Sequence, residues 1–102
     1  MNEYNVKGER DGPWKVYLSN GQLNWSANYI DGKFNGSYES FWSNGKLFYR
    51  GNYICGVRDG LWESYFDDGQ LNTKFKHKGV DYYGLYESYR PDGQLQSIEF
   101  LI

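Results

Sequence analysis

The feature that most constrains this chain is a pattern that occurs four times. A glycine opens each copy at positions 12, 36, 60 and 84, so successive copies lie 24 residues apart without any insertion. Each glycine is followed by an aromatic pair, by Asn-Gly or Asp-Gly, and by a leucine, as in Gly36-Ser-Tyr-Glu-Ser-Phe-Trp-Ser-Asn-Gly-Lys-Leu47. A fixed period of this size indicates a repeat architecture.

Because the copies follow one another without interruption, we predict that the 102 residues form a single repeat domain. Arg10-Asp11-Gly12 recurs as Arg58-Asp59-Gly60, which indicates that the chain starts inside a repeat. A length of this order suits a single domain. The predicted units are a partial repeat over 1–11 and four repeats over 12–35, 36–59, 60–83 and 84–102.

Each repeat predicts a β-hairpin followed by a connector. The arms are rich in aromatic residues, which favour strands. Between them, Asn-Gly or Asp-Gly predicts a type I turn closed by a glycine with positive φ. The predicted arms are 14–18 and 22–30, 38–42 and 46–54, 61–66 and 70–78, and 85–90 and 94–102. Connectors are expected at 31–36, 55–60 and 79–84, the third with a different shape because its glycine comes one position early.

No helix is expected, because apolar positions alternate by two and glycine recurs too often for a helix longer than one turn. The pattern therefore predicts an all-β fold of eight short strands in a meander, in which each hairpin pairs with the next.

The order of glycine, aromatic pair, Asn/Asp-Gly, leucine, tyrosine and glycine resembles the MORN repeat. It is closest to the variant repeat, in which an aromatic replaces the second glycine of the usual Gly-x-Gly opening, here at Trp14, Tyr38, Trp62 and Tyr86. The resemblance implies an elongated, twisted, single-layer antiparallel meander of about four hairpin repeats. For function it implies protein–protein contact without catalytic residues, as in small bacterial antitoxin-like or immunity-like proteins. Lipid association is proposed for MORN proteins more generally.

Composition excludes several classes of partner and location. The net charge is −2, which does not suit a nucleic-acid binder. No apolar run reaches the ~18 residues that a membrane span needs, and the first residues contain no apolar signal region. Cys55 is the only cysteine, so no internal disulfide can form and a cytoplasmic location is expected.

The sequence contains no pattern typical of an active site or a metal site. His77 and Cys55 occur once each, in different repeats. His77 occupies the repeat position of Tyr29 and Tyr53, so we interpret it as a ring of the framework. Zinc spacings, nucleophile elbows and phosphate loops are missing from the sequence. We therefore expect neither an enzyme nor a bound cofactor or metal.

Aromatic residues that vary between copies are the first candidates for partner binding. A single-layer sheet has no second layer to cover a face, and exposed aromatic patches typically mark interaction sites. We predict that Trp25, Trp42, Phe48 and Phe66 are substantially exposed; alternatively, these rings only thicken the sheet. The full set of candidates is Trp25, Phe48, Trp42, Tyr49, Phe66 and Tyr83.

Glu39, Glu63 and Glu87 are the second set of candidates, because they share one repeat position. They form either an acidic stripe that meets a basic partner or a solvated row that protects the sheet edges.

Three functions remain open at this point. The first is a non-enzymatic protein-binding module that neutralises or scaffolds another protein, such as an antitoxin, an immunity protein or a phage inhibitor. The second is a structural protein that self-assembles through the edges or faces of its sheet into a homodimer. The third is a binder of a lipid headgroup or another small ligand through the aromatic face.

Overall fold

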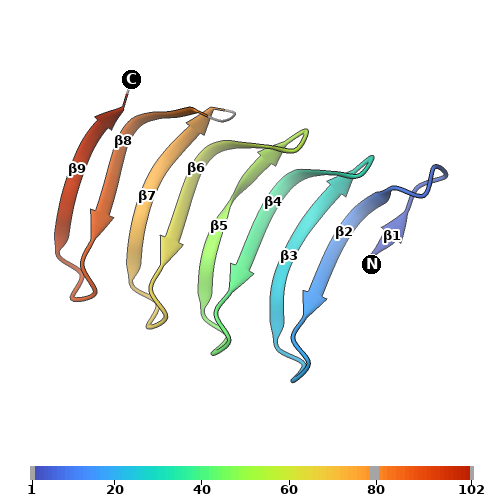
Figure 1. The fold of residues 1–102 in the computed structure, drawn as a ribbon, viewed down its shortest axis with the longest axis horizontal. Helices are drawn as coiled ribbons and strands as arrows, with labels where there is room; N and C mark the ends of the chain where they lie inside the picture. The colour runs from blue at the N-terminus through green and yellow to red at the C-terminus, as the bar shows by residue number, and fades with distance from the viewer. Residues whose placement is uncertain (1, 79–80, 102) are drawn as a thin grey trace.

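The described part of the chain folds into one nine-stranded antiparallel sheet, in which each strand pairs with its neighbours in the sequence (Figure 1). The computed structural model describes residues 2–78 and 81–101, and the side chains of all of these except 81–83, 100 and 101. The strands are β1 (Glu3–Tyr4), β2 (Arg10–Tyr17), β3 (Leu23–Ile30), β4 (Lys33–Phe41), β5 (Leu47–Ile54), β6 (Val57–Tyr65), β7 (Leu71–Lys78), β8 (Asp81–Tyr89) and β9 (Leu95–Leu101).

The predicted fold class is confirmed. The molecule measures 47 × 36 × 12 Å, and its smallest dimension leaves room for a single sheet only, since two stacked sheets lie ≈ 10 Å apart before their outer side chains are added. The described residues contain no helix. The ninth strand, the two-residue β1, lies in the partial repeat over residues 1–11.

The Asn-Gly and Asp-Gly turns have the predicted geometry. At the first of them, the Gly21 amide donates to the Leu18 carbonyl over 2.9 Å and the Leu18 amide donates to Gln22 over 2.7 Å. The Asn20 side chain also accepts the Gln22 amide, over 2.9 Å. A short polar side chain that bonds to its own backbone stabilises such a turn. The four turn glycines have φ values of 90°, 89°, 93° and 88°, at Gly21, Gly45, Gly69 and Gly93.

The connectors are shorter than predicted. Of residues 31–36 and 55–60, only Asp31-Gly32 and Cys55-Gly56 form turns, because β4 begins at Lys33 and β6 at Val57. Asp31 and Cys55 have φ values of 49° and their glycines 81° and 85°. Positive φ at both central residues is a type I′ turn, whose twist matches that of the flanking strands. Residues 79–80 of the third predicted connector lie outside the described part of the chain, and β8 begins at Asp81.

The glycines that define the period lie inside strands, where they form bulges. Ala27 pairs with Tyr38 and Tyr29 with Phe34, so Asn28 alone faces residues 35–37. The Asn28 amide donates to the Asn35 carbonyl over 2.9 Å and holds the bulge together. Equivalent bulges bend β4, β6 and β8 (Figure 1), and the glycine supplies the positive φ that each requires. These values are 103°, 74° and 76°, at Gly36, Gly60 and Gly84.

The core lies on one side of the sheet, which we call the aromatic face because it carries Trp14, Tyr38 and Trp62. Successive side chains of a strand point to opposite sides, so the strand register assigns every residue to a face. Among the residues whose side chains are described, the five buried hydrophobic ones belong to the aromatic face: Trp14, Ala27, Tyr29, Trp62 and Phe75.

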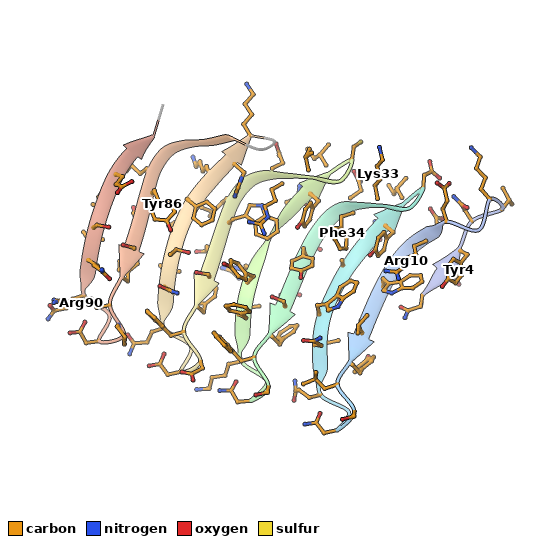
Figure 2. All side chains as sticks on the ribbon, viewed as in Figure 1. Tyr4, Arg10, Lys33, Phe34, Tyr86 and Arg90 are labelled. Carbon is orange, nitrogen blue, oxygen red and sulfur yellow. The ribbon has the colours of Figure 1, made fainter. Side chains whose placement is uncertain are left out.

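Rings pack against rings along the aromatic face. The ring centroids of Tyr29 and Phe34 lie 4.8 Å apart, those of Phe34 and Tyr53 4.8 Å, and those of Tyr53 and Trp62 5.1 Å. Figure 2 shows this row of rings crossing the sheet from Tyr4 through Phe34 to Tyr86. Contacts of this kind stabilise a fold by more than the area that they bury would suggest. The row of rings therefore provides the packing that a second layer of structure provides in other folds.

His77 belongs to the same row. It is 4% exposed, and its ring meets that of Phe75 edge-on with centroids 5.0 Å apart. This packing agrees with the interpretation of His77 as a framework ring.

Candidate protein-binding surfaces on the two faces of the sheet

The three glutamates and the aromatic candidates whose side chains are described lie on opposite faces. Ser40 pairs with Tyr49 while the preceding residue, Glu39, pairs with Arg50. Tyr49 therefore lies on the aromatic face and Glu39 on the other, which we call the ladder face. The structure brings Trp42, Phe48 and Tyr49 together near the Asn44-Gly45 turn. Trp25 packs separately against Phe34 and Tyr38, and Tyr83 pairs with Lys76 in the register.

The aromatic candidates are not substantially exposed, so that expectation was wrong. Trp42 stacks on Phe48 with centroids 4.2 Å apart, and Phe48 on Tyr49 at 4.5 Å. The Trp42 indole also donates to the Tyr65 carbonyl over 3.0 Å. The aromatic candidates whose side chains are described are half-buried: Trp25, Trp42, Phe48, Tyr49 and Phe66. The side chain of Tyr83 lies outside the described residues.

The glutamates alternate with basic residues on the ladder face. Arg50 lies between Glu39 and Glu63 in the register, and Lys74 lies between Glu63 and Glu87. The complete row runs across eight strands as Lys15, Ser26, Glu39, Arg50, Glu63, Lys74, Glu87 and Ile98. We call it the charge ladder. Opposite charges on neighbouring strands attract, so the row alternates in sign rather than forming a purely acidic stripe.

Arg50 and Glu63 form the closest ion pair of the ladder that we observe. The Arg50 Nε donates to the Glu63 carboxylate over 2.8 Å. This hydrogen bond raises the pKa of Arg50. Burial, followed by the charge of Glu63, raises the pKa of Tyr65, whose ring lies beside the Arg50 guanidinium. At the centre of the ladder, the side chains of Arg50, Glu63 and Tyr65 therefore interact with one another.

Exposed aliphatic side chains on the ladder face were missed by the sequence analysis. Leu61 is 42% exposed, Leu85 48% and Ile98 51%. A signal was present, because Leu61 and Leu85 each precede a framework aromatic and so must point to the other face. Within the part of β2–β9 and their turns whose side chains are described, the large exposed apolar residues share this face: Tyr17, Ile30, Ile54, Val57, Leu61, Leu85, Leu95 and Ile98.

An open hollow of about 290 Å³ lies on the ladder face over β4, β5 and β6. Its walls include Glu39, Arg50, Glu63 and Leu61, and small Ser37 contributes to the lining. The hollow thus combines one apolar wall with three charged groups.

Within residues 2–78 and 81–101, no group of three or more His, Cys, Asp or Glu is placed to hold a metal ion. The described chain also lacks any helix with the length and apolar character needed to cross a membrane.

The fold and its two faces define a class of protein: an open sheet of hairpin repeats whose rings stabilise one face. A family model described as the MORN repeat variant matches residues 10–31, 34–54, 58–78 and 82–101. The chain belongs to this family, as its resemblance implied. MORN repeats generally bind proteins or membrane lipids and are binding modules rather than catalysts. Comparison with curated proteins and with solved structures finds no match.

Proposed function

We propose that this chain is a non-enzymatic protein-binding module and that its ladder face contacts the partner. The observation that carries the proposal is the distribution of apolar side chains. The buried rings lie on the aromatic face, whereas Leu61, Leu85 and Ile98 remain about half exposed on the ladder face. Apolar side chains that a protein leaves in water beside charged groups are typical of interaction surfaces.

The hollow is the proposed anchor point. A partner side chain that enters it packs against Leu61, and completing the burial of such a half-exposed leucine contributes about 1 kcal/mol. Glu39 and Arg50 present opposite charges on the rim, so they favour a partner whose charges alternate in the complementary order. In this proposal the three predicted glutamates belong to the binding surface, and the aromatic candidates mainly support the sheet.

Neutralisation of the partner, as in the antitoxin-like and immunity-like proteins that the sequence resembles, is the form of binding that we propose. Scaffolding is the alternative outcome. The partner's own activity, measured with and without this chain, distinguishes the two, because a scaffold leaves that activity intact.

The proposal is tested by identifying a partner in a lysate of the source organism and measuring its affinity for variants. Leu61→Asp and Leu85→Asp should each weaken binding about tenfold or more, equal to about 1.4 kcal/mol, while the unfolding midpoint stays near that of the parent. Trp42→Ala is the matched variant on the aromatic face. It should lower stability yet leave the affinity of the folded protein unchanged.

The opposite pattern would overturn the ladder face as the site. If Trp42→Ala stays folded and loses binding while both aspartate variants bind like the parent, the aromatic candidates form the binding surface.

A further inference from the structure

The outer edges of β2 and β9, the long strands nearest the two ends of the sheet, differ in how they are covered. Beside β2, the Asn2 amide donates to the Pro13 carbonyl over 3.0 Å. The Asn2 side chain donates to the Lys15 carbonyl over 2.9 Å and accepts the Lys15 amide over 2.8 Å. Together with β1, Asn2 therefore covers the edge of β2. At the other end, β9 pairs with β8 alone among the described strands, and residues 95–99 are all exposed.

The side chains of β9 differ from those of the other return arms. Glu99 occupies the repeat position of Ala27, Gly51 and Phe75. A residue at this position lies beside the first aromatic residue of the following repeat, and Ala27, for example, pairs with Tyr38. A further arm of the same kind, or β2 of another molecule, would bury the Glu99 carboxylate under an aromatic ring. Burial of an unpaired carboxylate is strongly unfavourable, and a charge in this position is a known protection of sheet edges. Glu99 thus opposes extension of the array in its own register.

Ile98 is the second difference. Its repeat equivalents Arg50 and Lys74 face Glu63 and Glu87 on the next strand. Ile98 has no charge to offer to such a carboxylate and is instead half exposed and apolar. The outer edge of β9 is therefore suited to a strand that places an apolar residue opposite Ile98 and a hydrogen-bond donor opposite Glu99.

We propose that this strand is β9 of a second copy, paired antiparallel about a two-fold axis at Ile98. In this register Ile98 faces Ile98 of the second copy on the ladder face. On the aromatic face, the Glu99 carboxylate faces the Ser97 hydroxyl of the second copy, and the symmetry repeats the contact. The two sheets join into one, with their like faces continuous. This self-association concerns the sheet edge and does not depend on the partner binding proposed for the ladder face.

Charge and polarity select this register among its neighbours. An axis at Glu99 would place two carboxylates directly opposite each other, which is destabilising. An axis at Ser97 would place Ile98 opposite Gln96. Because the edge of β2 is covered, the pairing uses the same surface on both copies and closes after two molecules, whereas a head-to-tail contact would continue into a fibre.

Light scattering coupled to size-exclusion chromatography gives the first test. The parent should have a mass close to twice 12.0 kDa at concentrations that support the dimer and should dissociate on dilution. Ile98→Lys should weaken association at least tenfold, because it places two ammonium groups face to face. Lysine is also the residue of the equivalent position, Lys74, so this variant is expected to fold. Leu61→Lys makes the same change three strands away and should remain a dimer.

A crosslink tests the register. In a Cys55→Ser background, Ile98→Cys should form an intermolecular disulfide under mild oxidation, because residues directly opposite in antiparallel strands lie within the range that a disulfide bridges. Leu61→Cys is the matched control and should stay reduced. A parent that is monomeric at every concentration, or a crosslink equally fast at both positions, would overturn the proposal.

Discussion

Leu61 and Trp62 are neighbours in β6, yet 42% of Leu61 is exposed and 0% of Trp62. The contrast holds across the sheet. On the aromatic face, framework rings such as Phe34 and Trp62 pack against rings of the adjacent hairpin, whereas the ladder face presents charges and scattered aliphatic side chains to water. In a sheet of one layer, the side chains of one face must bury one another, because no second layer exists to do so. The opposite face then contributes little to folding and is available for binding.

Replacement of a central ring should have the largest effect. Trp62 contacts the rings of Tyr53 and Tyr38 and the guanidinium of Arg58. Trp62→Ala should lower the free energy of unfolding by about 3–5 kcal/mol, the usual range for loss of a buried aromatic. Urea unfolding followed by circular dichroism measures it, with Leu61→Ala as the control on the ladder face. Equal losses for both variants would contradict the division between the faces.

A single methyl group placed beneath the same ring should have the next largest effect. A Cβ added at Gly51 would lie 2.1 Å from an atom of the Trp62 indole, so the ring must move. Gly51→Ala should destabilise the protein by about 1–3 kcal/mol, as overpacking typically does.

The Gly51→Ala effect should depend on the ring. Combined with Trp62→Leu, the alanine should have a much smaller effect, and the same denaturation experiment gives the coupling energy. Additive losses would show that Gly51 is not limited by its contact with Trp62.

The hairpin turns could be predicted from the sequence, whereas the register between neighbouring arms could not. Asn-Gly and Asp-Gly specify local φ values, so the turn at Ser43-Asn44-Gly45 depends on no distant contact. Cys55-Gly56 was missed as a two-residue turn because cysteine is not typical of positive φ. The opposition of Arg50 to Glu63 depends on the bulge at Gly60, and a shift of one residue would place Glu63 on the other face.

The candidate site was predicted in part for the same reason. Repetition identified Glu39, Glu63 and Glu87 as one row, but their alternation with Arg50 and Lys74 follows from the register between arms. Exposure of the aromatic rings could not be predicted either. Trp42 is half-buried because its indole reaches the backbone of Tyr65 in the next hairpin, and the sequence does not encode that distance.

Loss of a charge from the ladder should have a small effect on stability. The Arg50 side chain is 54% exposed, and exposed ion pairs contribute about 0.2–1 kcal/mol. Glu63→Gln should therefore lower the free energy of unfolding by no more than this, and salt should reduce the difference. Unfolding at low and high salt measures it. A loss as large as that of Trp62→Ala would place the ladder among the main determinants of the fold.

Alkaline pH should weaken the packing of the aromatic face. Burial, and then the nearby Tyr53 hydroxyl, raise the pKa of Tyr38 above its ordinary value. Above about pH 10, the ordinary tyrosine pKa, the unfolded chain loses this proton before the folded one. The contribution of Tyr38 is therefore complete below pH 10 and declines as pH rises through its folded pKa. Tyr38→Phe should flatten this part of the stability profile, and an unchanged profile would argue against a perturbed Tyr38.

The division between the faces is tested most directly by alanine substitutions along β7, from Lys74 to His77, read as free energies of unfolding. Phe75 and His77 are buried on the aromatic face, whereas Lys76 is exposed on the ladder face. The account predicts an alternation of period two: losses of about 3–5 kcal/mol at Phe75, a clear loss at His77, and changes within about 0.5 kcal/mol at the lysines. Losses at Lys74 and Lys76 as large as that at Phe75 would show that the ladder face is also packed, and would contradict the account.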